Sequence, residues 1–166
     1  MEDRNNLPLR KNCEGYFLVD GKLLVKDSGK GFLIFPGGGI DENEAVEEGM
    51  KREAKEEVGV IVEDLSELGK VEFIWDDNWA KTEKQKERFN KFRGDEMHFF
   101  IGKIKSFEKN DQLEEDFWNE HHSMEIKEAI AFIENSKPFD EGIKEYREAQ
   151  LKFLSLLNQQ IENLNG

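Results

Sequence analysis

A strand, a glycine-rich loop and an amphipathic helix are predicted in close succession between residues 31 and 60, and this order constrains the fold more than any other feature of the sequence. The apolar run 31–35 is typical of a strand. It ends at Pro36, which cannot donate a hydrogen bond within a sheet, and at three glycines, which favour a loop: Gly37, Gly38 and Gly39. The fold must therefore combine sheet with helix.

The helix is expected to begin at a cap on Asp41 or Asn43 and to end near Val58, with Gly59 as its stop. Apolar residues recur at every fourth position and predict one stripe that packs on a sheet: Val46, Met50, Ala54 and Val58. Gly49 lies in the middle of this helix, where glycine costs about 1 kcal/mol relative to alanine. We therefore expect a close backbone contact at Gly49.

Strands and helices are also predicted on both sides of this segment. Residues 15–26 hold two apolar runs around Asp20-Gly21, which indicates a β-hairpin with a type I′ turn. Periodicity predicts the later elements, which are one or two strands in 60–75, a firmer strand in 97–104, and helices in 124–135 and 142–164.

The composition predicts one cytoplasmic domain, residues 1–166, that binds neither membranes nor nucleic acids in general. A chain of 166 residues can bury one core but is short for two domains. The single cysteine, Cys13, excludes an internal disulfide, and a reactive thiol there is the less favoured interpretation. No apolar run approaches membrane-spanning length. A net charge of −13 argues against general nucleic-acid binding, because phosphates are held by Lys and Arg.

Three glutamates near the end of the predicted helix form the strongest candidate site. Glu53, Glu56 and Glu57 stand at i, i+3 and i+4, so they share one helix face. Like charges this close repel, and their carboxylate oxygens suit Mg²⁺ or Mn²⁺. Arg52 can orient a carboxylate through its guanidinium fork. A solvated, salt-bridged helix surface is the alternative, but it would make the glycine loop, Arg52 and the spacing coincidental.

The segment 38–60 resembles the Nudix box. The family's fixed positions are all matched here, by Gly38, Glu44, Arg52-Glu53, Glu56-Glu57, Gly59 and the aliphatic Val60. Trp118 and Glu128-Ala129-Ile130 resemble a later segment of the family. The resemblance implies an α+β fold, an α/β/α sandwich with a mixed central sheet.

The same resemblance implies an enzyme that uses Mg²⁺, with Mn²⁺ as an alternative, to cleave a pyrophosphate linkage in a nucleoside diphosphate joined to another group. It implies a metal held by Glu53, Glu56 and Glu57 with help from the carbonyl of Gly37. Glu53 ranks slightly ahead of Glu96 as the general base. The expected partner is a small nucleotide-like substrate, and a homodimer is left open.

Two other functions are alternatives to a pyrophosphate-cleaving hydrolase. A catalytically silent nucleotide-binding regulator on the same fold has no need to keep Glu53, Glu56 and Glu57 together. An isomerase of isoprenoid diphosphates normally needs a catalytic cysteine, and Cys13 lies in the wrong region. The substrate markers of some family subgroups are absent from residues 75–78, which weakens ADP-ribose and dinucleoside polyphosphates as substrates without excluding them.

The polar segment 76–95 is an expected insertion or substrate lid. Basic and aromatic side chains alternate there and could bind phosphates and a base, with Lys84, Lys86, Arg88 and Trp79 as the candidates. A solvated insertion whose aromatic side chains pack into the body is equally favoured. For His98, a hydrogen-bonded histidine in the core or on the sheet is favoured over one that faces the substrate.

Overall fold

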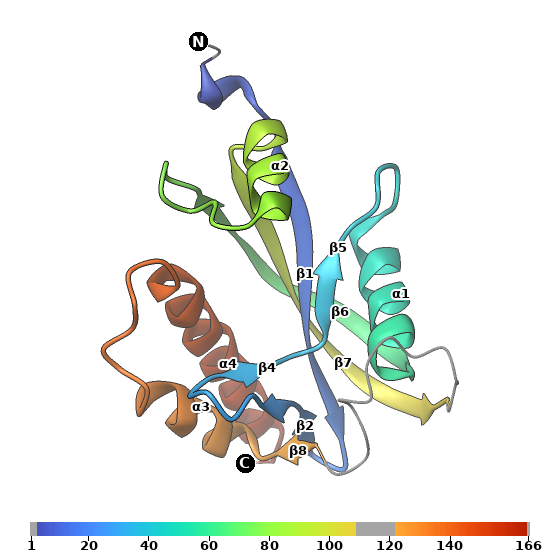
Figure 1. Ribbon diagram of the computed structural model, residues 1–166. Helices are drawn as coiled ribbons and strands as arrows, with labels where there is room; N and C mark the ends of the chain where they lie inside the picture. Colours follow the sequence, from blue (N-terminus) through green and yellow to red (C-terminus); the bar gives the residue numbers. More distant parts are fainter. Residues whose placement is uncertain (1–2, 109–121, 166) are drawn as a thin grey trace.

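A mixed sheet with helices on both faces forms the centre of the molecule (Figure 1). The computed structural model describes residues 3–108 and 122–165, so Trp118 lies outside the described residues. The main strands lie in the order β6 (Val60–Ile74), β7 (Gly94–Phe107), β1 (Leu9–Val19), β2 (Lys22–Leu24) and β8 (Ser123–Met124). β1 and β7 are parallel, whereas β6–β7, β1–β2 and β2–β8 are antiparallel. This arrangement confirms the expected α+β class with a mixed sheet.

The two faces of the sheet are covered by different helices (Figure 1). On one face α1 (Val46–Val58) buries Met50, Ala54 and Val58 against Phe17 and Phe100, so the predicted apolar stripe is confirmed. The opposite face packs against two helices, α3 (Ile126–Glu134) and α4 (Lys144–Asn165). Neighbouring residues on a strand point to opposite faces, which sends Tyr16 and Phe99 toward this second core. None of the helices that the structure describes has the length and apolar character needed to cross a membrane.

The predicted hairpin connects β1 to β2. Val19 pairs with Lys22, and the two residues between them have positive φ angles of 52° at Asp20 and 77° at Gly21. Two central residues with positive φ define the type I′ turn, so this prediction is confirmed.

The prediction of a loop at the three glycines is wrong, because β5 (Gly37–Gly39) is a strand that pairs antiparallel with β1. The physical reason is a close approach of two backbones. A Cβ atom on Gly37 would overlap the carbonyl oxygen of Cys13 on β1. The preceding apolar run forms only the short strand β4 (Leu33–Ile34), which pairs with β3 (Lys26–Asp27).

The expected start of α1 is also wrong. Neither Asp41 nor Asn43 caps this helix, whose N-cap residue is Ala45. A turn joins the backbone N–H of Glu44 to the carbonyl of Asp41 at 3.1 Å, and Asn43 has a positive φ of 68°. The helix can begin only after this turn. Its predicted end is confirmed, because Gly59 adopts a left-handed conformation that favours glycine.

The segment 76–95 contains a helix that was not predicted, α2 (Glu83–Lys91). Thr82 and Gln85 form a reciprocal capping box at its start, in which each side chain accepts a hydrogen bond from the other's backbone. At its other end, the Arg4 guanidinium donates to the carbonyls of Phe89 and Phe92 at 2.5 and 2.9 Å. The N-terminal segment therefore fastens α2 to the molecule.

Candidate active site

Arg52 joins the loop before α1 to the carboxylates on the helix. Its Nε and Nη2 atoms donate to the two carboxylate oxygens of Glu44 at 2.8 and 2.9 Å. Nη2 also donates to the carbonyl of Gly39 at 3.0 Å. Nη1 donates to Glu53 and to Glu56, both at 3.1 Å. One guanidinium thus gathers three glutamates beside the glycine strand.

The ion pair between Arg52 and Glu44 fixes the charges in this region. The hydrogen bonds from Arg52 lower the pKa of Glu44 to about 2, and a backbone N–H from Asp41 acts in the same direction. The same pairing with Glu44 raises the pKa of Arg52 above its ordinary value. Both groups therefore stay ionised at neutral pH, and the pairing is bidentate, which fixes orientation as well as distance.

The glycines of the Nudix-like segment leave room for functional side chains. A Cβ atom on Gly38 would lie 2.6 Å from the carboxyl carbon of Glu53. A Cβ atom on Gly49 would lie 2.5 Å from Ile40 and 2.9 Å from a carboxylate oxygen of Glu44, which confirms the expected close contact. Any larger residue at Gly38 would displace the Glu53 carboxylate.

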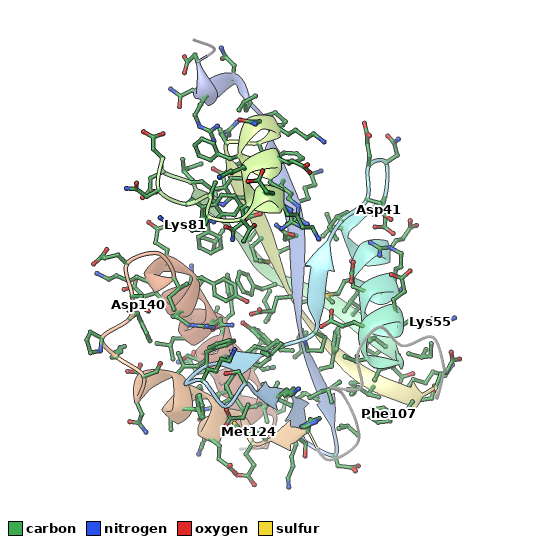
Figure 2. The ribbon with its side chains drawn as sticks, in the orientation of Figure 1. Asp41, Lys55, Lys81, Phe107, Met124 and Asp140 are labelled. Carbon is green, nitrogen blue, oxygen red and sulfur yellow. The ribbon has the colours of Figure 1, made fainter. Side chains whose placement is uncertain are left out.

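The three predicted metal ligands lie along one side of α1. Figure 2 labels Asp41 in the loop before the helix and Lys55 in its last turn, and the three glutamates belong to the C-terminal half of the helix, around Lys55. Glu57 accepts a hydrogen bond from the N–H of Gly37 at 3.4 Å. The Glu53 side chain is 19% exposed and that of Glu56 is 55% exposed.

The chemistry of this donor set fits a divalent cation, because carboxylate and backbone oxygens are hard ligands. The carboxylates of Glu53 and Glu56 both turn toward Arg52. Within residues 3–108 and 122–165, no three acidic, histidine or cysteine side chains already converge on one point. A cation would therefore be bound after side-chain rotation, which glutamate permits at low cost.

Glu96 is held by a second set of contacts, on β7. Its carboxylate lies 2.7 Å from Nε2 of His98, and Nδ1 of His98 contacts Glu67. Burial alone would raise the pKa of Glu96, but the hydrogen bond to His98 and the charges of Lys70 and Lys11 lower it overall. Glu96 is therefore a carboxylate at neutral pH. His98 is buried and hydrogen-bonded, as the favoured interpretation predicted.

The candidate lid residues differ in exposure and contacts. Lys84 and Lys86 are exposed, and Lys86 pairs with Glu83 at 3.4 Å, whereas Arg88 is half-buried. Trp79 stacks on the buried Trp75 with ring centroids 3.7 Å apart. The tryptophans thus match the alternative in which aromatic side chains of this segment pack into the body.

Cys13 lies on β1 opposite Gly38 of β5, and its Sγ is 3.5 Å from the carbonyl of Gly38. Burial raises the pKa of its thiol to about 12. A thiol that stays protonated is a poor nucleophile, so the structure supports an unreactive Cys13.

Sequence reasoning missed two charged residues on β1. Glu14 is 4% exposed and accepts hydrogen bonds from Tyr16, Tyr146 and Gln150, and its burial raises its pKa. Its signal was present, since a lone carboxylate directly precedes the apolar run that begins at residue 15 of this strand. Arg10 forms an ion pair of 4.0 Å with Asp95, and no local pattern marks it.

Comparisons with known proteins agree with this geometry. The model of the NUDIX domain matches residues 10–147. Among solved structures, a structure titled as an ADP compounds hydrolase has a TM-score of 0.56 at 20% identity, with 96% of this chain and 76% of that chain covered. A NUDIX hydrolase from Nitrosomonas europaea has a TM-score of 0.54 at 17% identity, with 85% and 90% covered. Both identities are low, so these likenesses show the fold.

The search of curated proteins found no match to this chain. The family model, however, spans most of the sequence and contains the whole glycine-strand and α1 region. Membership in a family of hydrolases favours an enzyme over a catalytically silent regulator. The chain therefore belongs to the Nudix hydrolase family.

Proposed function

We propose that this enzyme uses Mg²⁺ to cleave the pyrophosphate linkage of a nucleoside diphosphate joined to another group. One observation carries the proposal. Arg52 holds Glu44, Glu53 and Glu56 against the carbonyl of Gly39, so acidic side chains gather beside a strand that has no side chains of its own. Hard oxygen donors of this kind favour Mg²⁺, and Mn²⁺ fits the same set.

The metal ligands in this proposal are Glu53, Glu56 and Glu57, together with the carbonyl of Gly37. A divalent cation held there would polarise phosphoryl oxygens and offset charge on the leaving group. Arg52 has a positioning role, because different N–H groups of its guanidinium donate to the carboxylates of Glu44 and Glu53. Glu44 supports Arg52, and Gly38 and Gly59 give the segment its shape.

The general base in this proposal is Glu53, with Glu96 as the second candidate. The carboxylate of Glu53 fills the space next to Gly38, beside the proposed metal ligands. Glu96 is also ionised and is fixed by His98, so it can accept a proton if the substrate reaches β7. Comparing Glu53→Gln with Glu96→Gln in a pH–rate profile distinguishes the two, since only loss of the base removes the acidic limb.

The remaining expectations stay predictions. The substrate is a small nucleotide-like molecule, and one structural neighbour is titled an ADP compounds hydrolase, so ADP derivatives belong in the first screen. Lys84, Lys86, Arg88 and Trp79 are proposed to contact it from a lid. A homodimer and a cytoplasmic location are likewise untested predictions.

The test is a hydrolysis assay on nucleotide sugars, dinucleotides and nucleoside triphosphates with Mg²⁺ or Mn²⁺, in which a coupling phosphatase and pyrophosphatase convert the phosphomonoester or pyrophosphate products to inorganic phosphate. We expect metal-dependent cleavage of at least one class, and we expect Glu56→Gln and Glu57→Gln to slow it on the order of a hundredfold. Glu47→Gln is the matched control, because Glu47 is exposed on the same helix and faces away from the cluster. Unchanged turnover in both site variants would refute the proposal.

A further inference from the structure

We infer that Arg10, with Arg88 beside it, binds a phosphate group of the substrate on the side of β5 opposite the α1 carboxylates. This inference rests on the proposed function, because it assigns the residues that hold the anionic part of that substrate. It adds a binding residue on β1 that the Nudix-like segment does not contain.

The first support is the position of the Arg10 guanidinium. Its Nη2 atom lies against Gly39, where a Cβ atom would approach it to 2.6 Å. Its side chain is 26% exposed, so the group is partly withdrawn from water yet still open to a ligand. Gly38 and Gly39 are neighbours on one strand and point to opposite faces. The glycine strand is thus flanked by Glu53 on one face and by Arg10 on the other.

The second support is that Arg10 is incompletely paired. Within the residues that the structure describes, Asp95 is its ion-pair partner, at 4.0 Å, which is longer than a charge-assisted hydrogen bond. Both oxygens of Asp95 are already engaged, because Asn12 and the indole N–H of Trp75 donate to them. A guanidinium carries five N–H donors, so Arg10 retains capacity for another acceptor.

The third support is a second positive charge. Burial lowers the pKa of Arg10, and the positive charge of Arg88 acts in the same direction. Arg4 fixes the end of α2 next to Arg88 by bonding the carbonyls of Phe89 and Phe92. Like charges repel, and a phosphate that accepts forked hydrogen bonds from both guanidinium groups would offset that repulsion.

The surroundings extend from the candidate catalytic helix to a cavity. Gly39, which Arg10 adjoins, accepts a hydrogen bond from Arg52 through its carbonyl, so Arg10 lies near the group that holds the α1 carboxylates. On the other side, Asp95 and Trp75 line a cavity of about 920 Å³, which is within the range of small-molecule sites. Figure 2 shows Lys81 on one side of this region and Asp140, in the connection before α4, on the other. A phosphate bound at Arg10 therefore leaves room for the attached group.

The test is the binding of inorganic pyrophosphate and of ADP in EDTA at low ionic strength, measured by titration calorimetry. In the absence of metal, binding reports on the arginines. We expect Arg10→Gln to weaken both ligands about tenfold or more and Arg88→Gln to weaken them severalfold. Lys105→Gln is the control for the loss of one charge, because Lys105 is exposed near the far end of β7, and we expect it to change affinity less than about twofold.

Arg10→Lys keeps the charge but removes the fork, so we expect intermediate affinity, and this variant serves if Arg10→Gln does not fold. Wild-type affinity in folded Arg10→Gln, or in both Arg10→Lys and Arg88→Gln, overturns the inference. The two proposals fail separately. Arginine-dependent pyrophosphate binding without metal-dependent cleavage of any substrate would leave the anion site intact and remove the proposed function.

Discussion

Arg52 shows how one residue can organise a site that consists mostly of negative charge. Its guanidinium contacts Glu44, Glu53, Glu56 and the carbonyl of Gly39, so four acceptors share one positive group. Glu44 takes the bidentate position and thereby fixes the plane of the guanidinium. The carboxylates nearer the helix end are then oriented by a group that is itself held in place.

The ion pair between Glu44 and Arg52 should affect the stability of the protein in acid. Its pKa in the folded state is lowered to about 2, below the ordinary value of 4.5, because Arg52 binds the carboxylate form. A lowered pKa stabilises the folded state above the ordinary pKa, and this stabilisation is lost as pH falls through about 2. Glu44→Gln should therefore lower the free energy of unfolding at neutral pH by roughly 1 kcal/mol, a value reduced for partial solvent exposure.

The measurement is denaturant unfolding of wild type and Glu44→Gln between pH 7 and pH 2. The difference between them should be full above about pH 5 and should shrink toward pH 2. Glu47→Gln controls for the loss of a helix charge. A difference that is constant over the whole pH range would contradict the assigned role of the ion pair.

Among the strands, β5 is the one in which the lack of side chains matters most for stability and activity. A Cβ atom on Gly37 would overlap the backbone of β1, whereas a Cβ atom on Gly38 would meet only the movable carboxylate of Glu53. Gly37→Ala should therefore lose stability by about 1–3 kcal/mol. Gly38→Ala should keep most of its stability and lose activity. Thermal unfolding and phosphate release measured on both variants check this, and equal effects on stability would contradict it.

The proposed role of α2 as a substrate lid depends on its basic side chains. Neutralising Lys84, Lys86 and Arg88 together should raise KM if these groups bind substrate phosphates. Because Arg88 is half-buried while the two lysines are exposed, most of the increase should already occur in Arg88→Gln alone. Steady-state kinetics on the single and triple variants measure this. An unchanged KM in the triple variant removes α2 from the binding surface.

The elements differ in how far the sequence could predict them. The hairpin was predictable because Asp20-Gly21 fixes a local turn, and α1 because its apolar stripe has helical spacing. α2 was missed although Thr82 and Gln85 carry a capping signature, since only its local ends, and no apolar stripe, indicate a helix. β5 was missed because its pairing depends on the backbone of a distant strand, and glycines alone favour a loop.

The two faces of the sheet contribute different residues to the proposed site. α1 supplies carboxylates from one face, and their type and spacing could be read from the sequence because they lie within a few turns. Arg10, Asp95 and Trp75 come together from three separate strands or loops, so no local pattern could have predicted them. The protein has a net charge of −13, so acidic side chains outnumber basic ones. The register of the paired strands determines which of the basic side chains lie near the carboxylates.

Mn²⁺ titration calorimetry measures whether the α1 glutamates bind a divalent cation. We predict uptake by wild type and by Glu47→Gln, and uptake weakened at least about tenfold in Glu56→Gln and Glu57→Gln, because each loses a charged oxygen ligand. If both site variants bind Mn²⁺ with the affinity of wild type, the α1 glutamates do not hold the cation.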